Sequence, residues 1–127
     1  MTIKNLLKTL LFLTTLFGVS AYGAQDTSSK LLGKTFKYTY KDAVYHVQFK
    51  SASELHWKAI QGEEAGREDL ETYTLQKISP TEYFIAWIEK DGLGVSQVLN
   101  LKEKRVHTFL KIDKELISLN GTLTQLN

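Results

Sequence analysis

Four residues of this sequence could together move a proton or hold an anion: Tyr38, Tyr40, Arg67 and Glu89. Tyr38 and Tyr40 are two positions apart, as are Trp87 and Glu89, so within extended strands each pair points to one face. Burial raises the pKa of a carboxyl group and a nearby guanidinium lowers it, so a glutamate beside phenols and an arginine can be tuned for either task. The alternative is structural: Glu89 ends a solvated strand, and the two phenols are strand aromatics with hydroxyl groups at the rim.

Other residue types that carry chemistry are scattered along the chain. The histidines, His46, His56 and His107, form no pair at i, i+2 or i, i+4 spacing, so the sequence predicts no metal site. Ser96 and Ser118 stand outside any nucleophile-elbow motif, and no glycine-rich loop precedes a helix. These patterns argue against acyl transfer and nucleotide binding.

The elements that must position these residues are strands. Runs rich in aromatic and β-branched residues, most of them alternating with polar residues, predict about eight strands. Most of the links between them are of turn length, so successive strands must be antiparallel neighbours; the one longer link, 61–67, is charged and flexible. The predicted strands are Thr35 to Tyr40, Val44 to Phe49, Leu55 to Ile60, Glu68 to Ile78, Glu82 to Glu89, Val95 to Leu101, Arg105 to Ile112 and Leu116 to Leu126.

Such a series can close into an up-and-down barrel or split into a sandwich. We expect an all-β closed barrel, because closure removes the two exposed edges of a meander. Eight strands leave an interior just wide enough for side chains or one small ligand. The sequence does not decide which face of 82–89 is inside, because both faces are apolar. Gly121 indicates a bulge or a close approach in the last strand rather than part of a glycosylation site at Asn120.

The N-terminal residues resemble a signal peptide. Lys4 and Lys8 precede an apolar stretch and then small residues, with cleavage expected after Ala21 or Gly23. An uncleaved anchor is the alternative, but the apolar stretch is short for a membrane span. We therefore expect a signal peptide over 1–23, a flexible lead-in over 24–31, one barrel domain over 32–127, and a periplasmic or secreted bacterial protein.

Composition limits the partners of the mature chain. The chain has 16 basic and 14 acidic residues and no cysteine, so neither a disulfide nor a lipidated cysteine is available. Removal of the two leader lysines leaves 14 basic and 14 acidic residues, a net charge of zero. We expect no binding to nucleic acid and none to membranes after signal cleavage.

The order of motifs resembles the MoaF-like family over nearly the whole mature chain. The resemblance lies in the segments 33–40, 71–73, 83–89, 95–100 and 121–124, and its most specific part is Trp87-x-Glu89 followed by Ser96-Gln97-Val98. It implies a calycin-like, lipocalin-like barrel with an internal cavity.

A second resemblance is to bacterial phenolic acid decarboxylases. It places Tyr38, Tyr40, Arg67 and Glu89 at the family's functional positions, where tyrosines and arginine hold the substrate and the glutamate takes part in proton transfer. It implies that no cofactor is needed. The turn after Glu89 departs from that family's pattern, since 90–92 read Lys-Asp-Gly.

The leading hypothesis is an exported barrel that binds a small aromatic or anionic ligand through Tyr38, Tyr40, Arg67, Trp87 and Glu89. The second is a cofactor-free lyase acting on phenolic acids through the same residues apart from Trp87. A third is a periplasmic interaction or inhibitor module that uses the outside of the barrel. The sequence leaves the oligomeric state open.

Overall fold

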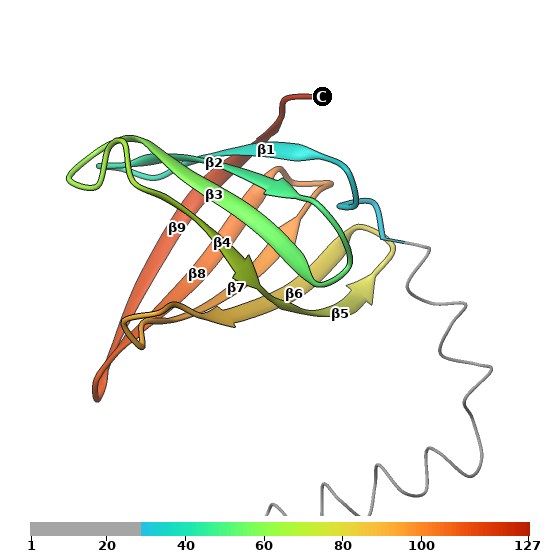
Figure 1. Ribbon diagram of the computed structural model, residues 1–127. Helices are drawn as coiled ribbons and strands as arrows, with labels where there is room; N and C mark the ends of the chain where they lie inside the picture. The colour runs from blue at the N-terminus through green and yellow to red at the C-terminus, as the bar shows by residue number, and fades with distance from the viewer. Residues whose placement is uncertain (1–28) are drawn as a thin grey trace, which may run out of the picture.

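The computed structural model describes residues 29–127; the predicted signal peptide and residues 24–28 of the predicted lead-in lie outside these residues. In the described part of the chain no helix is suited to crossing a membrane. Nine strands follow one another (Figure 1): β1 (Thr35–Thr39), β2 (Val44–Phe49), β3 (Glu54–Gln61), β4 (Glu68–Thr72), β5 (Thr74–Ser79), β6 (Glu82–Ile88), β7 (Gly94–Asn100), β8 (Arg105–Ile112) and β9 (Glu115–Gln125).

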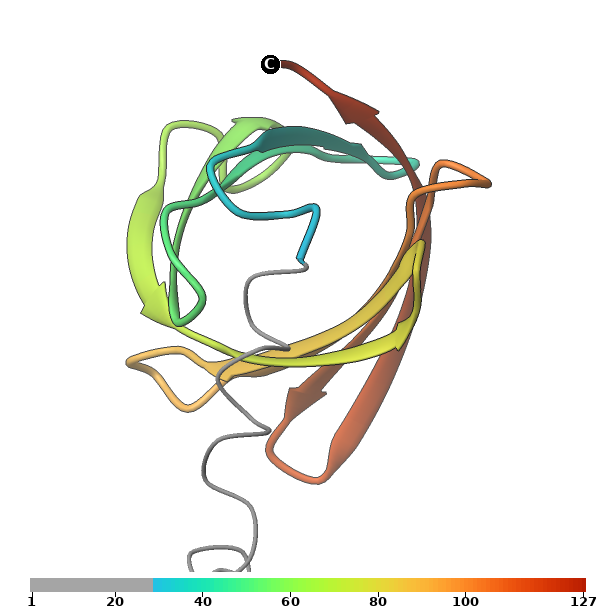
Figure 2. The same ribbon diagram turned by 90° about the vertical axis from the view of Figure 1, so that its right-hand side faces the viewer.

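The strands form one antiparallel sheet that curls into a nearly closed barrel (Figure 2). The order across the sheet is β4-β3-β2-β1-β9-β8-β7-β6-β5, so every pair except β1 with β9 is a neighbour in sequence. The pairing of β1 with β9, from Phe36 opposite Gln125 to Thr39 opposite Thr122, brings the first and last strands together. The expected all-β antiparallel barrel is confirmed, with nine strands instead of eight.

The ninth strand arises because the predicted strand from Glu68 to Ile78 is two strands, and the prediction of one strand here was wrong. Tyr73 separates them: its N–H donates to the carbonyl of Ser53 at 2.9 Å, and its hydroxyl donates to the carbonyl of Ser51 at 2.7 Å. These bonds hold Tyr73 to the β2–β3 turn, where the chain leaves β3 and begins to pair with β6. Residues on both sides of Tyr73 stay extended and alternating, which is why the sequence reads as a single run.

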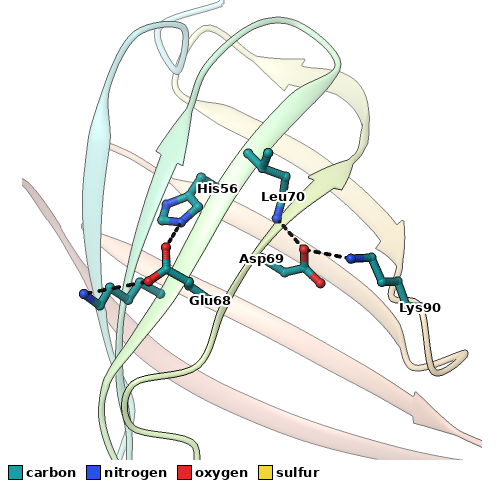
Figure 3. A network of polar contacts seen from close by, with 6 residues as sticks. His56, Glu68, Asp69, Leu70 and Lys90 are labelled. Atoms are coloured by element: carbon teal, nitrogen blue, oxygen red, sulfur yellow. Dashed lines mark hydrogen bonds and ion pairs between the residues drawn. The ribbon is translucent and has the colours of Figure 1, made fainter.

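The two ends of the sheet, β4 and β5, are therefore consecutive in the chain. No backbone ladder joins β4 to β5 or β6 among the described residues, although β4 contacts β6. We call the boundary between β4 on one side and β5 and β6 on the other the seam. One polar contact crosses it near the turn after β6, where Lys90 Nζ lies 3.3 Å from Asp69 Oδ1 (Figure 3). Asp69 Oδ1 also accepts the backbone N–H of Leu70, which, with Lys90, lowers the pKa of Asp69.

The structure decides which face of β6 is inside. Tyr83, Ile85 and Trp87 are buried, whereas Phe84 is 40% and Ile88 75% exposed. Since residues two apart share a face, Glu89 follows Trp87 toward the interior. The heavier aromatic face is therefore the inner one.

One end of the barrel is filled by apolar side chains. Leu31, the last residue of the predicted lead-in, is fully buried there. The backbone N–H of Lys30 donates to the Tyr83 hydroxyl at 3.0 Å, and the N–H of Gly33 donates to the Phe49 carbonyl at 2.8 Å. These contacts hold the segment before β1 across this end of the barrel (Figure 2). We call this the closed end.

Candidate ligand-binding site

A pocket lies in the barrel interior, in the part that the closed-end side chains do not fill. Its volume is about 80 Å³, smaller than the roughly 300–1,000 Å³ of sites for drug-sized ligands. Residues from the β3–β4 loop and the β6–β7 turn are among those that line it, and both are only partly buried. The lining residues are Tyr38, Tyr40, Tyr45, Val47, Trp57, Glu64, Trp87, Glu89, Leu93, Val95, Gln97, Thr108, Leu110 and Leu119.

Aromatic rings from three adjacent strands, and from the residue after β1, form one continuous wall of this pocket. Tyr38 meets Tyr40 edge to face with ring centroids 6.4 Å apart. Tyr40 meets Tyr45 at 6.2 Å, and Tyr45 meets Trp57 at 6.1 Å, again edge to face. Such pairs stabilise one another beyond the burial of their area, so the wall is fixed before any ligand binds.

Gly121 of β9 makes room for the ring of Tyr40. A Cβ atom at position 121 would lie 2.7 Å from the Thr39 carbonyl oxygen and 2.9 Å from Cδ1 of Tyr40. The predicted close approach in the last strand is thereby confirmed. The Tyr40 hydroxyl is 2.7 Å from Thr108 Oγ1 across the barrel, and burial raises the pKa of Tyr40 to about 12. Tyr40 is therefore a neutral phenol at physiological pH.

Glu89 is the pocket carboxyl group whose pKa lies nearest to neutral pH. The turn after β6 positions it: its N–H donates to the Leu93 carbonyl at 2.8 Å, and its carbonyl accepts the N–H of Gly92 at 2.9 Å. The φ of +91° at Gly92 suits glycine and closes this turn. The indole N–H of Trp87 donates to Glu89 Oε2 at 3.2 Å.

The surroundings of Glu89 favour its neutral form. Burial raises the pKa of Glu89 to about 7, the Trp87 N–H opposes this shift, and the charges of Glu71, Asp91 and Glu64 add to it. No lysine, arginine or histidine among residues 29–127 forms an ion pair with Glu89. At neutral pH this carboxyl group can therefore both give and take a proton.

Glu64, from the loop between β3 and β4, is the second carboxylate of the lining. The Tyr45 hydroxyl donates to Glu64 Oε1 at 3.0 Å, and Arg67 donates to Glu64 Oε2 at 2.8 Å. Burial first, and then the charge of Glu64, raises the pKa of Tyr45 well above its usual value, so Tyr45 also stays neutral.

Two polar atoms in the pocket wall have no hydrogen-bond partner. They are the hydroxyl oxygen of Tyr38 and Oε1 of Gln97, on side chains that are 1% and 5% exposed. Burial raises the pKa of Tyr38 well above its usual value, so its hydroxyl stays protonated. Buried polar groups in folded proteins nearly always have a partner, so these two atoms distinguish this part of the wall from the apolar core.

The residues singled out by sequence divide into two groups. Tyr38, Tyr40, Trp87 and Glu89 all line the pocket. Arg67 does not: its side chain is 64% exposed, and its guanidinium contacts Glu64. The structure thus assembles the phenols and the carboxyl group of the expected site and leaves the guanidinium outside the lining.

Several residues that line the pocket were not predicted from the sequence. Gln97 carries a readable signal, because it is a polar residue between Val95 and Leu99 on a face that is otherwise apolar. Thr108 occupies a similar place in β8. Whether Gln97 and Thr108 have hydrogen-bond partners depends on distances across the barrel, and local sequence patterns do not predict such distances.

The other chemistry-bearing residues lie outside the pocket. His56 is 2.9 Å from Glu68 Oε1 on the outer face (Figure 3), and His107 is 2.9 Å from Asn120 Oδ1. Within residues 29–127, no group of three histidine, aspartate or glutamate side chains is arranged to hold a metal ion.

Comparison with known proteins places the fold. A crystal structure of a Burkholderia vietnamiensis protein, described as a candidate beta-lactamase, superimposes with a TM-score of 0.73 over 77% of this chain and 97% of that chain. The two sequences are 23% identical, so the likeness shows the shared fold alone. No curated protein shows significant similarity to the sequence. The model of the MoaF-like family matches residues 32–124, and the chain therefore belongs to the MoaF-like family.

Proposed function

We propose that this protein is an exported binding protein that holds one small aromatic molecule in the barrel pocket. The observation that carries the proposal is the pocket itself, an aromatic wall that also presents two buried polar atoms without partners, Tyr38 Oη and Gln97 Oε1. A preformed, mostly apolar cavity with a few polar groups is the usual form of a small-molecule site. Its volume of about 80 Å³ favours a ligand of one ring over a larger one.

Of the two ligand types expected from the sequence, the lining favours the aromatic over the anionic. No lysine, arginine or histidine is among the lining residues, whereas Glu64 and Glu89 are. An anion in this pocket would face two carboxyl groups with no basic side chain in the lining to offset them.

Tryptophan fluorescence tests the proposal directly. The chain has two tryptophans, Trp57 and Trp87, and both line the pocket, so the intrinsic signal reports on this site alone. Titration with single-ring aromatic molecules should give a saturable change in emission. If none of them alters the emission, the proposal is wrong.

A pair of valine substitutions on β7 supplies the matched control. Val95→Phe fills the pocket from its wall and should weaken binding by about tenfold or more, because the ring takes the ligand's place. Val98→Phe adds the same bulk on the opposite, outer face of β7 and should leave binding unchanged. Circular dichroism confirms that each variant is folded before it is titrated. Equal weakening by both variants would place the binding site elsewhere.

Export is the second part of the proposal, and the N-terminal sequence supports it. Mass spectrometry of the mature protein should find a chain that begins after Ala21 or Gly23 and occurs in the periplasm or medium. A full-length chain in the cytoplasm would contradict this part.

A second candidate function is the cofactor-free decarboxylation of phenolic acids. The observation that favours it is the pKa of about 7 at Glu89, which suits proton transfer at neutral pH and lies in a pocket lined by Tyr38 and Tyr40. Incubation with p-coumaric acid should then reduce its absorbance, and Glu89→Gln should abolish the loss. Turnover that survives in Glu89→Gln would remove Glu89 from the reaction.

A further inference from the structure

The residues that line the pocket include two carboxyl groups and no basic side chain. Glu64 and Glu89 line it, and the charges of Glu71 and Asp91 act on Glu89 as well. The one guanidinium nearby, Arg67, contacts Glu64 Oε2 from a largely exposed position. Within residues 29–127, the side-chain donor to the Glu89 carboxyl group is the indole N–H of Trp87, and this carboxyl group can accept a second donor.

The aromatic wall of the same pocket is suited to positive charge. Tyr38, Tyr40, Tyr45, Trp57 and Trp87 all line it. The faces of such rings attract ammonium groups, and the attraction is strongest where water is excluded. Tyr38 Oη and Gln97 Oε1, both buried and without a partner, can each accept a hydrogen bond from an ammonium group.

From this combination we infer that the ligand is a small organic cation, a primary ammonium on a short or single-ring carbon skeleton. Its N–H groups donate to Glu89 and to Gln97 Oε1, and its carbon skeleton lies against the aromatic wall. The inference rests on the proposed function, because it names the chemical class of the molecule held in that pocket.

Binding of a cation has a consequence for the proton on Glu89. At pH 7 about half of the Glu89 carboxyl groups carry a proton. The groups that face Glu89 from the surrounding elements are Tyr45, Glu64, Glu71 and Asp91, none of them basic. An ammonium group is then the first positive charge beside this carboxyl, and it lowers the pKa of Glu89. The proton leaves Glu89 for the buffer, and an ammonium–carboxylate pair remains.

Three matched ligands separate charge from shape: benzylamine, benzyl alcohol and benzoate are close in size and carry positive, zero and negative charge at pH 7. Isothermal titration calorimetry of the wild-type protein should show benzylamine binding about tenfold or more tightly than benzyl alcohol, with benzoate weakest. In two buffers of different ionisation enthalpy, benzylamine should release up to about half a proton per site.

Two glutamate variants test the role of Glu89. Glu89→Gln should abolish proton release and most of the preference for benzylamine over benzyl alcohol. Glu63→Gln removes an equal charge from an exposed position in the β3–β4 loop, outside the pocket lining, and should behave as the wild type does.

The outcomes distinguish the two proposals. Equal binding of all three ligands, or tighter binding of benzoate, overturns the inference and leaves the proposed aromatic pocket in place. Tighter binding of benzylamine that persists unchanged in Glu89→Gln also overturns it. Binding of none of the three overturns the inference together with the proposed function.

Discussion

Glu89 illustrates how a single side chain acquires its character from its neighbours. Its partner is the indole of Trp87, two residues earlier on the same face, and the charged groups around it are carboxylates. Burial disfavours the ionised form, and like charges disfavour it further. A glutamate in this position is therefore poised to change charge at neutral pH.

The raised pKa of Glu89 makes stability depend on pH. The unfolded carboxyl titrates near 4.5 and the folded one near 7, so the folded state holds the proton more tightly between these values. The stabilisation is complete below pH 4.5 and is lost as the pH rises through 7. Allowing for screening by solvent at this partly buried group, the loss is about 1–3 kcal/mol.

Glu89→Gln should remove this dependence. We expect thermal melts to show the variant more stable than the wild type at pH 8 and similar to it at pH 5. Glu63→Gln serves as the control and should retain the wild-type slope. A wild-type melting temperature that stays constant or rises from pH 5 to pH 8 would contradict the raised pKa.

At the scale of elements, β1 and β9 form the one strand pair that is not consecutive in sequence, and their fit depends on Gly121. A methyl group there would collide with the Thr39 carbonyl and the ring of Tyr40. The first of these atoms belongs to the backbone, so relief requires the two strands to move apart.

Gly121→Ala should therefore lower the free energy of unfolding by roughly 1–3 kcal/mol, measured by urea denaturation. Gly94→Ala on β7 is the matched control, because its new methyl group would lie 3.3 Å from Cβ of Lys111, a tight contact and not a collision. Equal losses in the two variants would show that the cost comes from strand propensity and not from the contact with Tyr40.

Local patterns in the sequence predict most of the fold. Alternation and turn residues give β2 and β8 with their observed bounds. Apart from the divided run, the other predicted strands differ from the observed ones by one residue at one or both ends. The division at Tyr73 could not be predicted, because the alternation continues through it and the change of partner is a tertiary event. The exposed position of the Arg67 side chain could not be predicted either, because it depends on the conformation of the β3–β4 loop. Spacing of two residues is itself geometry, so Tyr38 could be placed with Tyr40, and Trp87 with Glu89, on shared faces. The meeting of the two pairs in one pocket depends on which face of β6 is inside, and alternation left that open.

The interior of the whole molecule contains both a packed core and a pocket. Apolar side chains fill the closed end, where Leu31 is fully buried, while the pocket occupies the remainder. A barrel of this size has room for both, because its interior is just wide enough for packed side chains or for one small cavity.

Leu31→Ala should leave a void at the closed end and lower the free energy of unfolding by roughly 2–5 kcal/mol. Leu126→Ala makes the same chemical change at a residue that is 46% exposed, and it should cost less than about 1 kcal/mol. Denaturant titration of both variants makes the comparison. A small loss in Leu31→Ala would show that the segment before β1 is dispensable to the barrel.

Because of the seam, the barrel is easier to open between β4 and β6 than between any two strands that are paired. Separating any other two neighbouring strands breaks a ladder of backbone hydrogen bonds, whereas separating β4 from β6 breaks side-chain contacts alone, among them the pair of Lys90 with Asp69. The wall is therefore weakest along the unpaired edge of β4, the strand that carries Asp69 and Glu71. Among the strands, amide hydrogen exchange should accordingly be fastest along the edges of β4 and β5 that face the seam. We expect these two edges to separate locally before the whole barrel unfolds.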